Sequence, residues 1–212
     1  MQNHNGDFLL QSALPAINKY LSEPSSNIGF FSSLFDELAR AVWNLNSQHG
    51  LAAFAHLYRA LEKLSFAFPL YHARQNNSYM RAYDQLKKYF KGGELEFCSN
   101  FVREILGSEA LTATDKRKLK FSSNLTTHQN AYFTDHQRLV SISGSDELEI
   151  QIVDVFDFIV TLRNHYFHHL SGGNFSLDSR VIPYPDDFFL APTNVGLGLV
   201  GVVFGKMIVD AV

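Results

Sequence analysis

The chain has 212 residues and a mass of 24.0 kDa, which is enough to bury a sizeable core in one domain spanning residues 1–212. Hydrophobic residues make up 46% and charged residues 18%, a balance that excludes an intrinsically disordered chain. The net charge of -3 argues against a general nucleic-acid coat protein and leaves room only for a local basic patch. The single cysteine, Cys98, excludes an internal disulfide and a cysteine-based zinc knuckle.

Apolar residues recur at intervals of three and four in the first half of the chain, which predicts amphipathic helices that each bury one face. The 19 phenylalanines predict a core rich in aromatic rings. Pro69 should kink or end a helix, because proline lacks the amide hydrogen that a helix interior needs. The predicted helices cover 7–23, 31–45, 51–75, 78–90 and 94–106.

The helix over 31–45 is predicted to bury one stripe of apolar side chains. That stripe consists of Leu34, Phe35, Leu38, Val42 and Leu45.

The character of the chain changes at about residues 112–143, where short runs of polar and β-branched residues replace the helical pattern. We expect a small β or irregular insertion here, with a hairpin that pairs 121–125 with 138–142 and turns near Asp135-His136. A basic cluster opens the insertion and is a candidate RNA-binding surface, because phosphate contacts need cations. It comprises Lys116, Arg117, Lys118 and Lys120.

Ser145 is a good helix N-cap, and Asp146 and Glu147 would complement the dipole of the first turn. The helix that it opens is predicted to run to about Leu170. Its predicted core stripe is Ile152, Val155, Ile159, Leu162 and Tyr166.

A loop through Pro183, Pro185 and Pro192 should follow and lead to a glycine-rich C-terminal helix over 194–212. This last segment is strongly apolar, and a membrane span needs about 20 mostly apolar residues. The run is short and contains Lys206 and Asp210, so we predict a buried or dimer-packing helix and no membrane partner.

The N-terminal residues lack the positive flank and the apolar run of a secretory signal. We therefore expect a cytoplasmic protein.

The segment Arg163-Asn164-His165-Tyr166-Phe167-His168-His169 carries the highest concentration of chemically active groups. It places a permanent cation, an amide and three of the nine histidines within two helical turns. Asn164 and His168 are four residues apart and share a helix face. Arg163 and His168 lie about 140° apart around a helix. An arginine is long enough to reach around, and a second subunit could complete the site.

The pattern Arg163-Asn164-x-x-x-His168, late in a helix of a helical domain, resembles the Arg-x4-6-His signature of the HEPN superfamily. His169 also satisfies that spacing and is the reserve candidate. The resemblance implies an all-α, up-and-down helical bundle and a metal-independent endoribonuclease without a cofactor. It further implies a homodimer with both motifs facing one cleft, and a role in prokaryotic anti-phage defence or toxin–antitoxin control. An antitoxin or defence-system protein is then a possible partner.

The residue types suit RNA cleavage, because RNA supplies its own nucleophile in the 2′-OH. A histidine with a pKa near neutrality can take that proton or return one to the leaving oxygen. The hypothesis assigns acid–base work to His168 and transition-state stabilisation to the guanidinium of Arg163. Asn164 would orient His168 or donate to a phosphate oxygen.

Three alternatives stay open. The cluster could be a helix end whose Arg and His side chains cap carbonyl groups and interact with the helix dipole. His165 and His169 are spaced to chelate zinc, although no glutamate follows His165 as in the metalloprotease helix motif. The same Arg163 and His168 could also serve a non-catalytic HEPN-like module that binds a nucleotide, RNA or a protein.

Overall fold

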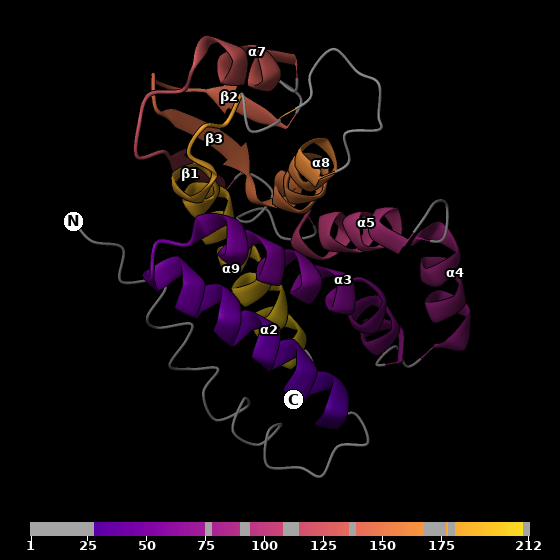
Figure 1. The fold of residues 1–212 in the computed structure, drawn as a ribbon. Coiled ribbons are helices and arrows are strands. Elements are labelled where there is room, and N and C mark those ends of the chain that lie inside the picture. The colour runs from indigo at the N-terminus through magenta and orange to yellow at the C-terminus, as the bar shows by residue number, and fades with distance from the viewer. Residues whose placement is uncertain are drawn as a thin grey trace, which may run out of the picture.

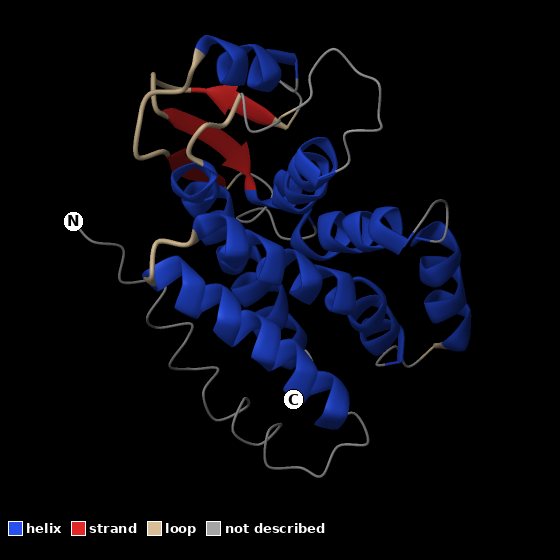
Figure 2. Cartoon of the chain, viewed as in Figure 1, coloured by secondary structure: helices blue, strands red, loops and turns tan. Residues whose placement is uncertain are grey.

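The computed structural model describes residues 28–74, 78–89, 94–107, 115–135, 139–167, 177 and 181–209. These residues are mostly helical, with one small antiparallel sheet (Figure 1, Figure 2), so the predicted helical class is confirmed in this coarse form. The helices are α2 Ile28–Asn46, α3 Gly50–Arg74, α4 Tyr79–Tyr89, α5 Glu94–Gly107, α7 Thr127–Asp135, α8 Val155–Phe167 and α9 Pro185–Val209. The strands are β1 Lys116–Lys120, β2 Val140–Ile142 and β3 Glu147–Gln151, followed by a single 3-10 turn, η1 Ile152–Asp154. The predicted helix over 7–23 lies outside the described residues.

Helix α3 occupies the centre of the fold and contacts α2, α4, α5, α8 and α9. Figure 1 shows α2 running along one side of α3, with α9 behind the pair. The helix does not end at Pro69, which lies inside α3. The apolar residues that recur at helical spacing along it, Phe54, Leu57, Leu61 and Leu64, are all buried.

The predicted buried face of α2 is wrong in part. Leu34 is fully buried, but Phe35 is 39% and Val42 is 45% exposed, and Ala41 is buried in their place. Alanine is small and permits close contact between helices. The prediction considered only large apolar residues and therefore did not include Ala41. The buried face is therefore rotated away from the one that hydrophobicity alone selects.

The start of α3 is fixed by the first turn of α9, 135 residues further along the chain. The backbone N–H of Leu51 donates to Asp186 Oδ1 at 3.0 Å, which satisfies one of the amides that a helix start leaves without a partner. Gly50 is buried at the same point. A Cβ there would collide with the carbonyl oxygen of Asp186 and lie 2.8 Å from the backbone nitrogen of Leu190.

The C-terminal helix begins earlier than predicted, at Pro185, and the expected loop through Pro192 is helical. Proline suits the first position of a helix, where its missing N–H has no partner to lose, and Asp186 and Asp187 follow it in the first turn. Pro192 lies inside α9, and the hydroxyl of Thr193 donates to a carbonyl in the preceding turn. Local propensity was overridden here by packing against α3.

By length and composition, the stretch Pro185–Gly205 of α9 could cross a membrane. However, 56% of its apolar window is buried inside the fold, and core helices pass the same test, so it is weak evidence for a span. The prediction of a buried or dimer-packing helix is confirmed in part, because Val195, Leu199, Val200 and Val203 are buried, and dimer packing stays a prediction.

The three strands form one sheet in the order β1-β3-β2, at one end of the helices (Figure 1). Both outer strands pair antiparallel with β3, so that Leu119 lies opposite Leu148 and Val140 lies opposite Ile150. The predicted hairpin is wrong, because β1 precedes residue 121, Asp135 ends helix α7, and β1 and β2 do not pair with each other. The predicted insertion at about 112–143 therefore ends too early, because the central strand β3 lies beyond it.

The predicted helix start at Ser145 is also wrong. Residues 147–151 form β3, in which Leu148 and Ile150 are buried and Glu147 and Glu149 point to the other face. This alternation has a period of two, which specifies a strand once a partner strand is available. The stripe predicted further along is confirmed, because Ile152, Val155, Ile159 and Leu162 are buried and Tyr166 is half-buried.

Helix α7 begins with a capping box that the sequence already contains. The N–H of Gln129 donates to the hydroxyl of Thr126 at 3.3 Å, and the N–H of Thr126 donates to Gln129 Oε1 at 2.9 Å. This reciprocal pair is the Thr-x-x-Gln signature of a helix start.

Aromatic rings join the sheet, α7 and α9, as the phenylalanine content predicted. The ring of Phe188 on α9 stacks on that of Phe133 on α7, with 6.3 Å between the ring centroids. Its centroid lies 5.2 Å from that of Phe121, which follows β1 directly. Phe133 also contacts Phe158 of α8.

We predict opposite effects for two alanine substitutions in this helical framework. Gly50→Ala should lower the free energy of unfolding by about 1–3 kcal/mol, because the added methyl group meets backbone atoms that cannot move aside. Gly198→Ala should raise it by about 0.5–1 kcal/mol, because that helical glycine has open space around its Cα. Urea unfolding measures both. Equal effects of the two changes would contradict the close approach of α3 and α9.

Candidate functional site

Arg163 is half-buried near the end of α8 and reaches the central helix α3. The centre of its guanidinium lies 4.7 Å from the centroid of the Tyr58 ring, which is within the range of a cation–π contact. Its Nη1 also donates to Asn164 Oδ1 at 3.1 Å. The two adjacent residues singled out in the sequence are thus in direct contact, and the arginine is held by a ring on one side and an amide on the other.

Tyr58 connects this arginine to an acidic side chain. Burial is the largest cause that raises the pKa of its phenol, and the nearby positive charge of Arg163 acts in the opposite direction. The exposed carboxylate of Glu62 lies one turn along α3, and its negative charge raises that pKa further. A cation, a phenol and a carboxylate are therefore assembled on neighbouring faces of α3 and α8.

Of the three histidines in the motif, only His165 lies within the described residues. The ring of His165 packs edge-on against Tyr132 of α7 at 5.4 Å, so it faces the α7 side of α8. His168 and the reserve candidate His169 lie outside the described residues, and so does the predicted helix end near Leu170. The contact between Arg163 and Asn164 is an addition that the structure makes, and the approach of His168 to them stays a prediction.

The predicted basic cluster lies on β1 and is largely paired with carboxylates. Lys118 contacts Glu147 at 2.8 Å and Lys116 contacts Glu149 at 3.2 Å, both across the pairing of β1 with β3. Arg117 contacts Asp115 at 2.6 Å. Lys120, at the end of the strand, also acts on the carboxylate of Glu147, whose pKa is lowered first of all by its hydrogen bond from Lys118. RNA binding at this surface would have to compete with these acidic neighbours.

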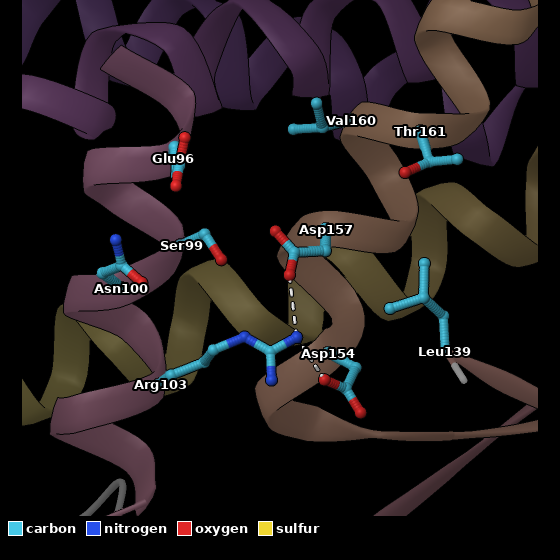
Figure 3. Close-up of a pocket in the computed structure, with 9 residues that line it drawn as sticks. All are labelled: Glu96, Ser99, Asn100, Arg103, Leu139, Asp154, Asp157, Val160 and Thr161. Carbon is cyan, nitrogen blue, oxygen red and sulfur yellow. Dashed lines mark hydrogen bonds and ion pairs between the residues drawn. The ribbon is translucent and has the colours of Figure 1, made fainter. Parts of the chain in front are cut away.

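A polar cavity of about 610 Å³ lies between α5 and α8 (Figure 3), where the sequence predicted no site. Arg103 of α5 contacts Asp154 Oδ1 at 2.6 Å and Asp157 Oδ2 at 2.8 Å. No local motif marks this site, because its charges come from two segments about 50 residues apart. The lining residues are Glu96, Ser99, Asn100, Arg103, Leu139, Asp154, Asp157, Val160 and Thr161.

Asp154 is the most buried charge of this cavity, with 8% of its surface exposed. Burial is the main cause that raises its pKa, and the positive charge of Arg103 opposes that effect. Because a buried carboxylate is costly without a partner, the ion pair with Arg103 offsets the cost of burying Asp154.

Within the described residues, no group of three or more His, Cys, Asp or Glu side chains is arranged to hold a metal ion. Comparisons of the chain with protein-family models, curated proteins and solved structures found no match.

We predict that Arg103→Ala lowers the free energy of unfolding at pH 7 by about 1–3 kcal/mol, because it leaves two carboxylates facing each other. Burial raises the pKa of Asp154, so the folded protein takes up a proton at this carboxylate more readily than the unfolded chain does. The stability lost in the variant should therefore shrink as the pH falls from 7 to about 4. Urea unfolding at both pH values measures it. The control is Arg117→Ala, whose ion pair is exposed and should contribute under about 0.5 kcal/mol. A pH-independent loss would contradict the assignment.

Cys98, next to the cavity on α5, should be unreactive in the folded protein. Burial, helped by the nearby Asp157 carboxylate, raises the pKa of its thiol to about 12. Because the thiolate is the reactive form, labelling by a disulfide reagent at pH 8 should be on the order of a thousandfold slower than in the urea-unfolded chain. Rapid labelling of the folded protein would show that the thiol is accessible.

Proposed function

We propose that this protein is a metal-independent endoribonuclease whose site is built on Arg163, Asn164 and His168. The observation that carries the proposal is the position of the Arg163 guanidinium, which is held over Tyr58 at 4.7 Å and bound to Asn164 Oδ1 at 3.1 Å. A cation fixed in this way is oriented before substrate arrives. Preorganised charge is the largest contribution that proteins commonly make to a transition state.

The proposed reaction is the attack of the RNA 2′-OH on the adjacent phosphorus atom. His168 takes the proton of the 2′-OH or returns one to the departing 5′ oxygen. The Arg163 fork neutralises the charge that builds up on the phosphorus oxygens, and Asn164 orients the histidine or donates to one of these oxygens. The bond that breaks is P–O5′, so the products are a 2′,3′-cyclic phosphate and a 5′-hydroxyl.

The HEPN-like assignment rests on the resemblance of the Arg163-to-His168 motif. It brings the expectation of an up-and-down bundle that forms a homodimer in the cytoplasm, with two copies of the motif sharing a cleft. A role in prokaryotic anti-phage defence or toxin–antitoxin control, with a neutralising partner, belongs to the same proposal.

A second candidate is a non-catalytic module that binds a nucleotide, RNA or a protein through the same residues. The paired cations of β1 favour it, because Lys116, Arg117 and Lys118 each contact a carboxylate and leave little free positive charge to grip a long RNA. A single phosphate at Arg163 would need no such surface.

We predict that Arg163→Ala/His168→Ala lowers the rate of RNA cleavage at least about a thousandfold, because it removes both the proton-transfer group and the charge stabilisation. Gel analysis of a labelled RNA measures the rate. The control is Arg81→Ala/His128→Ala, which removes the same residue types from exposed positions on α4 and α7 and should cleave like the parent.

Loss of folding is separated from loss of chemistry by Arg163→Lys, which keeps the charge but not the planar fork. It should unfold at the parent temperature and cleave at least about tenfold more slowly. A double variant that cleaves like the parent would refute the assignment. A parent that binds RNA without cleaving it would establish the second candidate instead.

A further inference from the structure

The cavity between α5 and α8 has an excess of negative charge that its own arginine does not balance. Among the described residues that line it, Glu96, Asp154 and Asp157 contribute three carboxylates, against one guanidinium from Arg103. Two negative charges of these described residues are therefore in excess. A ligand with positive charge is the chemistry that would complement them.

Ser99 provides an independent indication that something binds there. Its residue is only 7% exposed, and within the described part of the chain its hydroxyl makes no hydrogen bond. Figure 3 shows this side chain directed from α5 into the cavity, toward Asp157. Because this oxygen is not among the fully buried atoms without a partner, it is open to the cavity, where a ligand can form the hydrogen bond that the protein does not supply.

We propose that this cavity binds a small organic diamine. Two ammonium groups match the two excess negative charges. Each ammonium is a point charge with three donors, which the carboxylates of Glu96 and Asp157, the hydroxyls of Ser99 and Thr161 and the amide oxygen of Asn100 can accept. Arg163 does not line this cavity, so the diamine proposal is independent of the nuclease proposal.

The ligand classes that compete with a diamine fit the lining less well. An inorganic or organic anion would meet three carboxylates for one guanidinium. A divalent metal ion prefers six or more oxygen ligands, but Arg103 already takes one oxygen each of Asp154 and Asp157 and would repel a second cation beside it. The volume of about 610 Å³ lies in the range of small-molecule sites, which favours a whole small molecule over one inserted lysine side chain.

The test is calorimetric titration of the folded chain with putrescine at low salt. Putrescine should bind, whereas 1,4-butanediol, which has the same length and no charge, and inorganic phosphate should not. Glu96→Gln and Ser99→Ala should each weaken binding about tenfold. Neither exchange should lower the unfolding temperature, because the Glu96 side chain is exposed and the Ser99 hydroxyl has no partner to lose among the described residues. The matched control Asp135→Asn removes a carboxylate at the exposed end of α7 and should leave binding unchanged.

Three results would overturn the proposal. The first is phosphate or magnesium binding in place of putrescine. The second is binding that Glu96→Gln and Ser99→Ala leave intact, because the diamine would then sit elsewhere on an acidic protein. The third is tighter binding of Nα-acetyl-lysine methylamide, a lysine that is blocked at both backbone ends and keeps its ε-ammonium group. That result would point to a protein side chain as the occupant. Because RNA cleavage is not the readout, failure here leaves the nuclease proposal untouched.

Discussion

The close approach of α3 and α9 at Gly50 is the constraint on which the arrangement of the other elements depends. A residue without a side chain is needed there, because a Cβ would collide with the carbonyl oxygen of Asp186. The same turn of α9 supplies the Asp186 carboxylate that receives the N–H of Leu51. Steric fit and hydrogen bonding thus fix where α3 begins. Since α3 contacts five other helices, its start also determines where its remaining side chains meet them.

Two polar sites follow from that central helix and its neighbours. Where α8 crosses α3, Tyr58 forms a platform for Arg163, and Asn164 binds the same guanidinium. Where α8 faces α5, Arg103 bridges Asp154 and Asp157 at the edge of a cavity. The first site has a guanidinium held by a ring and an amide, whereas the described residues of the second have carboxylates in excess.

The sequence predicted the parts of this structure that depend on local pattern. Helix α3 and the buried residues of α8 follow from spacings of three and four. It failed where a distant partner decides. Glu147 resembles the acidic first turn of a helix until β1 pairs with β3 and brings Lys118 into contact with it. Likewise, Arg103 and Asp157 are unremarkable until α5 and α8 bring them together.

The central claim is that Arg163 and its neighbours promote attack by the RNA's own hydroxyl without a metal ion. Its most direct test is mass spectrometry of the RNA ends that the purified parent protein produces in excess EDTA. The account predicts 2′,3′-cyclic phosphate and 5′-hydroxyl ends, formed at the same rate with and without the chelator. Intact RNA, cleavage abolished by EDTA, or ends with a 5′-phosphate would contradict it.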